Sequence, residues 1–193
     1  MLHVANADFV TGNLLVGGDL DYDRHLARLQ LAELVDVGVN HIIDVRIEAD
    51  SSKLLAKLAP QVNYLHYGID DAGQRIGGRW FDVAVGFVLT ALQDEDGRVL
   101  THCHMGINRG PSLGFAVLLA QGWDPIAALD AIRAARPIAY VDYAGDALGW
   151  HHRRSGGSPA DLDRDLARVA QWRHDNALDV SAVIRGIRAR EQR

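Results

Sequence analysis

Apolar residues in the first hundred positions form short runs typical of buried strands, and longer stretches with helical spacing separate these runs. The short runs predict strands at Leu14–Val16, His41–Val45, Asn63–Tyr67 and Val99–His102. The stretches between them predict helices at about Asp23–Val37, Ser51–Leu58 and Trp80–Asp94. This alternation, with very short connections, predicts an α/β fold with a central, mainly parallel sheet flanked by helices.

The sequence after the predicted strand Val99–His102 predicts mostly helices. Residues Pro111–Gln121 are almost all apolar, which predicts a buried helix that ends at Gly122. Asp124 and Pro125 are typical of a helix start, and Pro137 is expected to stop this second helix.

The C-terminal part of the chain has a different character. The polar, glycine-containing segment His151–Gly157 predicts a linker. Ser158 then begins a helix-capping pattern, and a last helical pattern ends in the arginine-rich run Arg185–Arg193. We therefore expect residues 1–150 to form one domain and residues 151–193 to form a helical extension packed on it. A dimerisation or docking element is the alternative.

Composition narrows the class of protein. The 193 residues include 20 basic and 25 acidic side chains, and the resulting net charge of −5 does not support binding to nucleic acid or to an anionic membrane. We see neither an apolar run near the ~20 residues of a membrane span nor a signal-peptide pattern at the start. A single cysteine excludes an internal disulfide and is typical of a reducing compartment. We expect a cytoplasmic protein, and its oligomeric state stays open.

The run from Val99 to Ser112 contains the clearest candidate chemistry. It places the only cysteine, Cys103, directly after a predicted strand, and five residues separate Cys103 from Arg109. A turn of this length can wrap its backbone N–H groups around a phosphate, with the sulfur below the phosphorus and the guanidinium on the oxygens. These groups also favour the thiolate, which is the reactive form of cysteine. Gly106 suits a tight loop in which φ is positive.

Two other interpretations of the cysteine are weaker. Most lone cysteines are small buried side chains, but the five-residue spacing and the proline-started helix after it favour chemistry here. His102, Cys103 and His104 are adjacent, yet consecutive residues of a strand point to opposite faces and do not easily converge on one ion. We expect no metal and no cofactor.

The arrangement His-Cys-x5-Arg resembles the signature of the protein tyrosine phosphatase superfamily, and it is closest to the dual-specificity branch. The resemblance covers roughly residues 5–150. It implies a cysteine-dependent phosphomonoester hydrolase in which Cys103 attacks phosphorus and His102 supports the loop from behind. The phosphate-binding residues that it implies are His104, Met105, Gly106, Ile107, Asn108 and Arg109.

The resemblance also implies a general acid in the polar loop after the third predicted strand. The family's loop aspartate matches Asp71, which lies 32 positions before Cys103. A carboxylic acid here would protonate the leaving oxygen. Asp70, one residue earlier, is the alternative.

The chain departs from the family's pattern at one position. Members usually have Ser or Thr directly after the arginine, where the hydroxyl helps the thiolate to leave, and this chain has Gly110. Either Ser112 substitutes for that hydroxyl or the second chemical step is slow.

Gly110 keeps open a second function, a phosphate-binding module with weak or no turnover. Sulfur transfer of the rhodanese kind is a third, although that chemistry needs no acid. A phosphorylated substrate is expected in the first case, most simply a phosphoprotein. The variable loop positions contain no Lys or Arg, which argues against highly phosphorylated inositol lipids. Arg46, Arg75 and Arg79 are candidates for contacts at the rim, and the sequence does not distinguish phosphotyrosine from phosphoserine or phosphothreonine.

Overall fold

The computed structural model of the protein describes residues 2–191. A five-stranded sheet forms its centre. The strand order is β1-β2-β5-β3-β4, and only β1 runs antiparallel to its neighbour. This confirms the predicted α/β fold with a mainly parallel sheet. The strands are β1 (Ala7–Phe9), β2 (Leu14–Gly17), β3 (His41–Arg46), β4 (Asn63–Ile69) and β5 (Val99–His102).

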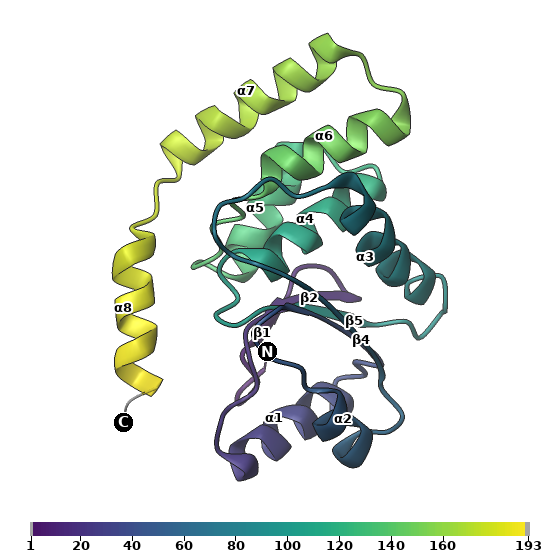
Figure 1. Cartoon of the computed structure of the whole chain (residues 1–193), viewed down its shortest axis with the longest axis vertical. Coiled ribbons are helices and arrows are strands. Elements are labelled where there is room, and N and C mark those ends of the chain that lie inside the picture. Colours follow the sequence, from purple (N-terminus) through teal and green to yellow (C-terminus); the bar gives the residue numbers. More distant parts are fainter. Residues whose placement is uncertain (1, 192–193) are drawn as a thin grey trace.

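Helices cover both faces of the sheet (Figure 1). One face packs against α1 (Arg24–Asp36) and α2 (Ser52–Leu58). The other face packs against a larger group: α3 (Gly78–Ala91), α4 (Arg109–Ala120), α5 (Pro125–Ala135) and α6 (Ala144–Ser155). Two further helices follow, α7 (Pro159–Asp175) and α8 (Val180–Glu191). In the described part of the chain, no helix is both long enough and apolar enough to span a membrane.

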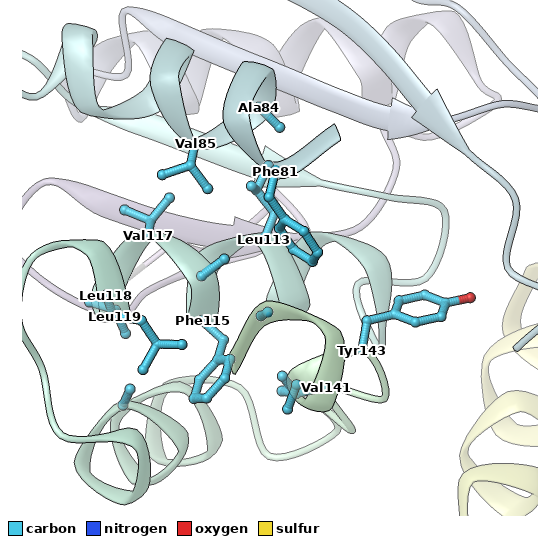
Figure 2. Packing of buried hydrophobic residues seen from close by; sticks show 14 of the residues in the cluster. Phe81, Ala84, Val85, Leu113, Phe115, Val117, Leu118, Leu119, Val141 and Tyr143 are labelled. Carbon is cyan, nitrogen blue, oxygen red and sulfur yellow. The ribbon is translucent and has the colours of Figure 1, made fainter. Parts of the chain in front are cut away.

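Helix α4 lies in the middle of the larger apolar cluster. Every residue from Arg109 to Leu119 is buried, which explains why the sequence leaves almost no polar face. Figure 2 shows Leu113 beside Phe81, and Val117 beside Val85, both across from α3. This packing holds the N-terminal end of α4 rigidly at the end of β5.

Side-chain caps determine where several helices begin. Asp23 accepts hydrogen bonds from the backbone N–H groups of His25 and Leu26 at 2.8 and 3.0 Å, and α1 begins at the next residue. Asp124 caps α5 in the same way, and Ser158 forms a capping box at the start of α7. The predicted starts of these helices are therefore correct to within a residue.

The interpretation of His151–Gly157 as a linker is wrong. Residues as far as Ser155 belong to α6, which the sequence analysis did not identify, and the helix ends at Gly156, whose φ is +75°. The polar residues of this segment indicated a linker, but they belong to the last turn of α6, where the side chains of Arg153 and Arg154 are exposed to solvent and that of His151 is partly so. His152 of the same turn is buried and lies 3.0 Å from Asp165 of α7. The division of the chain at residue 150, which falls inside α6, stays a prediction.

Helix α7 packs against the helical layer. Val169 and Trp172 are buried in the larger apolar cluster, and the Trp172 indole donates to Asp130 of α5 at 2.7 Å. Arg168 forms an ion pair with Asp124, also at 2.7 Å. These contacts place the start of α8 at the edge of the candidate site described next.

Candidate active site

The loop between β5 and α4, residues 103–109, is called the signature loop below. β5 lies between β2 and β3, with Gly17 and Asp44 on either side of His102; β2 and β5 end there, and β3 continues two residues further to Arg46. Cys103 is 2% exposed, and its N–H donates to the carbonyl of Gly17 at 3.3 Å. The loop thus begins at the carboxyl edge of the sheet, where parallel α/β folds bind ligands.

The carbonyl groups of the signature loop are all occupied by protein donors. The His104 carbonyl accepts from the backbone N–H of Asp19 at 2.7 Å, and the Ile107 carbonyl accepts from that of Tyr140 at 2.7 Å. Arg136 donates to the carbonyls of Met105 and Gly106 at 3.0 and 2.6 Å.

The N–H groups of the same loop show the opposite pattern. Within the described residues, none of the backbone N–H groups of positions 104–108 donates to another backbone carbonyl. With its carbonyls turned outward and its N–H groups unpaired, the loop has the hydrogen-bonding character of an anion site.

Gly106 is required by the shape of this loop. Its φ is +66°, which disfavours residues with a Cβ atom. A Cβ atom would also come within 2.4 Å of Nη2 of Arg136 and 2.6 Å of the carbonyl carbon of Gly17. Gly106 therefore shapes the loop from behind, and its carbonyl faces Arg136 rather than the cavity.

Arg136 is a site residue that the sequence analysis missed. Its guanidinium is buried and also donates to the side chains of Asn6 and Asp8, each at 2.7 Å. It comes from the end of α5, thirty residues after the loop that it supports. The sequence analysis identified only the next residue, Pro137, as the point where this helix stops.

Arg109, the first residue of α4, is held by an acidic partner. Its Nη1 and Nη2 atoms donate to the two carboxylate oxygens of Glu48 at 2.7 and 2.5 Å, and Nη1 also donates to the Ile69 carbonyl at 3.0 Å. These hydrogen bonds lower the pKa of Glu48 to about 2. Burial by itself would lower the pKa of Arg109, but the bonds to Glu48 and the nearby negative charges raise it above its usual value.

One edge of the Arg109 guanidinium remains available. A guanidinium has five N–H groups, and Glu48 and Ile69 take three of them. The Nε atom is buried without a hydrogen-bond partner among the described residues, although the Asp71 carboxylate lies 3.4 Å away. The free N–H groups are thus on Nε and Nη2, the pair that forms a side-on fork for two oxygens of one phosphate.

Asp71 lies over the signature loop, as its place in the sequence suggested. One of its oxygens accepts from the Asn108 amide at 2.6 Å and from the Tyr143 hydroxyl at 3.2 Å. Burial and the Asp71 charge raise the pKa of Tyr143 to about 12, so this phenol is a neutral donor at physiological pH. Figure 2 shows the Tyr143 hydroxyl directed away from the apolar cluster. The Asp70 side chain instead accepts from the Asp71 N–H at 2.8 Å.

The two histidines that flank Cys103 point to different partners. His104 lies 3.1 Å from Asp19, and His102 lies 3.7 Å from the buried Asp44. Burial lowers the pKa of His102, so the ring is neutral in the folded protein at physiological pH. Among the described residues, no group of three or more metal-ligating side chains comes together.

Arg46 is not available as a contact at the rim of the site. It is buried and donates to Asp44, Asp19 and Ser51, behind the signature loop. The reason is that Arg46 ends β3, where its side chain meets the carboxylates of the same sheet edge. Arg75, in contrast, is exposed and forms an ion pair with Asp146 at 2.7 Å.

Gly110 and Ser112 occupy the first turn of α4. A Cβ atom at Gly110 would lie 3.0 Å from the Thr101 carbonyl and 3.1 Å from the Cys103 nitrogen, closer than side chains normally pack. The Ser112 hydroxyl donates to the Asn108 side-chain oxygen at 3.1 Å and accepts from the Tyr143 N–H at 3.3 Å. Both bonds support the residues that hold Asp71.

A cavity of about 440 Å³ lies above the signature loop. Cys103, Arg109 and Asp71 all line it, although they come from the start of the signature loop, the first turn of α4 and the loop after β4. The other loop residues that line it are His104, Met105, Ile107 and Asn108. The structure thus brings together Cys103, Arg109 and Asp71, the three side chains that the sequence analysis singled out.

The sheet order, the signature loop and the helical layer give the chain a dual-specificity phosphatase-like fold, as the sequence resemblance implied. The crystal structure of human DUSP28 matches with a TM-score of 0.63 at 18% identity, over 78% of this chain and 95% of that one. DUSP15 matches with a TM-score of 0.60 at 22% identity, over 84% and 95% of the two chains.

Sequence comparison agrees with the structural comparison. Human dual specificity protein phosphatase 13B is 27% identical over 123 residues, which cover 60% of this chain and 60% of that protein's own length. No family model matches the sequence.

Proposed function

We propose that this protein is a phosphomonoester hydrolase that acts through a cysteinyl-phosphate intermediate. The observation that carries the proposal is the convergence of Cys103, Arg109 and Asp71 on one cavity, around a loop with unpaired N–H groups. This arrangement contains the nucleophile, the anion-binding groups and the proton donor that the reaction requires.

In the first step the Cys103 thiolate attacks phosphorus, and the bond from phosphorus to the leaving oxygen breaks as the sulfur–phosphorus bond forms. The Nε–Nη2 edge of Arg109 and the loop N–H groups bind the three remaining phosphoryl oxygens. Charge that develops on these oxygens in the transition state is stabilised by donors that are already in place. Glu48 contributes by holding the guanidinium in this orientation.

The leaving oxygen receives its proton from Asp71, and Asp71 then accepts a proton from the water that attacks the cysteinyl phosphate. Breaking the sulfur–phosphorus bond releases inorganic phosphate and restores the thiolate. Asn108 and Tyr143 act as positioning residues, because their hydrogen bonds go to one Asp71 oxygen and turn the other towards Arg109 Nε, where the phosphate would bind. Asp70 has no such contact with the signature loop, and this favours Asp71 as the acid.

A phosphate-binding module with slow turnover is the second candidate, and Gly110 favours it. No hydroxyl follows Arg109 directly, and the Ser112 hydroxyl is engaged with Asn108 and Tyr143. Release of the thiolate in the second step would then lack a hydrogen-bond donor. On this basis we expect hydrolysis of the cysteinyl phosphate to limit the rate even in the active enzyme.

The substrate that we propose is a phosphorylated protein in the cytoplasm, where a reducing environment keeps the single cysteine as a thiol. The loop residues that line the cavity include Met105 and Ile107 and no lysine. Apart from Arg109, the only Lys or Arg among the described lining residues is Arg188 of α8, so the loop itself gives little support for a substrate with several phosphate groups.

Rapid mixing of the purified protein with p-nitrophenyl phosphate, followed by acid quench, tests the proposal. We expect a burst of p-nitrophenol close to one equivalent and a phosphate adduct on Cys103 by mass spectrometry. Cys103→Ser should show neither, yet should still bind inorganic phosphate or vanadate. Phosphate binding without any burst in the wild type would identify the protein as a binding module instead.

A further inference from the structure

The last helix of the chain lies against the candidate active site. After α7 crosses the helical layer, the chain turns and α8 runs down one side of the molecule (Figure 1). Val180, Ile184 and Arg188 of α8 line the same cavity as Cys103 and Asp71. These three residues are four positions apart, so they lie on one face of the helix.

Burial along α8 follows the same face. Val180, Val183, Ile184 and Ile187 are half-buried, whereas Ser181, Ala182, Arg185 and Gly186 are exposed. Ile187 lines a second cavity, of about 660 Å³, which shares His104 and Met105 with the first. The apolar stripe of α8 therefore faces the outer side of the signature loop along most of its length.

The end of α7, which precedes α8, also contacts residues next to the candidate site. Arg173, in the last turn of α7, donates to the carbonyls of Val141 and Asp142 at 2.5 and 2.8 Å. The Asp142 N–H in turn donates to Asn108 of the signature loop at 2.7 Å. The helix pair is thus connected to the residues that line the cavity, just before α8 begins.

The cavity is lined by both charged and apolar residues. The charged ones are Arg109, Asp71 and Asp142, together with Arg188 of α8. The apolar ones are Met105, Ile107, Tyr140, Val180 and Ile184, and the last two belong to α8. A phosphomonoester bound with its phosphorus above Cys103 has room for its leaving group along these residues.

We propose that α8 forms part of the substrate site, and that Val180 and Ile184 are specificity-determining residues that favour phosphomonoesters of an aromatic group. This inference rests on the proposed function, because it assumes that the signature loop binds the phosphate. A flat ring can contact both side chains while the phosphate occupies the loop, and a short polar group cannot. Within the described residues, no backbone hydrogen bond joins α8 to the signature loop, and the contribution of Val180 and Ile184 is apolar contact.

The test compares the binding of phenylphosphonate and methylphosphonate by calorimetry, which requires no turnover. Ile184→Asn should lower the affinity for phenylphosphonate by about 5- to 10-fold, which is the loss expected when ~50 Å² of apolar contact is removed. The affinity for methylphosphonate should stay unchanged. Ala182→Asn, on the exposed face of the same helix, is the matched control and should bind both ligands like the wild type. Val180→Ser, a milder change one turn earlier, should act in the same direction as Ile184→Asn.

The outcomes separate the two proposals. If the wild type binds methylphosphonate and both α8 variants bind phenylphosphonate normally, α8 is not part of the substrate site and the proposed function stands. If the variants bind phenylphosphonate more tightly, α8 obstructs the cavity, which also overturns the inference. If the wild type binds neither phosphonate, the signature loop is not a phosphate site and the proposed function fails first.

Discussion

Replacing Arg136 with leucine removes the support beneath the signature loop, and Arg136 itself does not line the cavity over Cys103. The guanidinium makes four hydrogen bonds, to Gly106, Met105, Asn6 and Asp8. Leucine fills part of the volume and satisfies none of these acceptors. The carbonyls that Arg136 now holds outward would have to find water or other donors.

The size of the effect follows from burial. Arg136 is 4% exposed, and the Asp8 side chain is 42% exposed, so the ion pair with Asp8 contributes little. The bonds to Gly106, Met105 and Asn6 join a charged donor to acceptors near the protein interior, and such bonds contribute ~1.5–3 kcal/mol each before compensation. Removal of one buried charged partner typically costs 3–5 kcal/mol. We expect Arg136→Leu to lower the free energy of unfolding by about 3 kcal/mol, the lower end of that range, because water can solvate Asp8. A loss of this size corresponds to a fall in Tm of about 6–12 °C.

Calorimetric unfolding and phosphate binding measure the two consequences. We expect the fall in Tm together with a loss of phosphate affinity of at least about tenfold, equivalent to ~1.4 kcal/mol, because the loop N–H groups lose their alignment. Arg153→Leu, an exposed arginine on α6, is the control and should change Tm by less than about 2 °C. If Arg136→Leu unfolds and binds phosphate like this control, Arg136 does not hold the loop and our account of its geometry is wrong.

Three further predictions concern the site itself. Arg109→Lys should lower kcat by ~10²–10³-fold because an ammonium cannot reproduce the side-on fork, and steady-state kinetics that showed a change in KM alone would contradict this role. Asp71→Asn should slow hydrolysis of an alkyl phosphate by ~10²–10⁴-fold and of p-nitrophenyl phosphate far less, with Asp70→Asn mild on both; the reverse pattern would assign the acid to Asp70. The pKa of Glu48 is about 2 in the folded protein against its usual 4.5, so its stabilisation is complete above about pH 4.5 and is lost as the pH falls towards 2. The Tm of Glu48→Gln should therefore fall less than the Tm of the wild type when the pH is lowered from about 5 to about 3. If plots of Tm against pH for the two proteins are parallel over this range, Glu48 does not contribute this pH dependence.

Local patterns in the sequence were sufficient for the fold class. Strand runs, helical spacing and caps such as Asp23 and Asp124 depend on residues within one or two turns of each other, and the structure confirms the elements that they predict. The signature loop was visible for the same reason, since β5, Cys103 and Arg109 are contiguous in the chain. One exception is α6, whose last turn presents polar side chains to solvent and buries only His152, a residue without a strong apolar signal.

The sequence by itself determined which groups are the candidates for the proposed chemistry, because a strand, a short loop and a helix start place a thiol and a guanidinium together whatever surrounds them. The tertiary structure decided how those groups are held. Glu48 reaches Arg109 from 61 residues away, and Tyr143 reaches Asp71 from 72. Such pairs leave no periodic or local trace, since they form only when distant elements pack at the same edge of the sheet. The position of α8 over the cavity has the same origin: its amphipathic pattern predicted a helix, and only the packing of α7 determined which surface that helix meets.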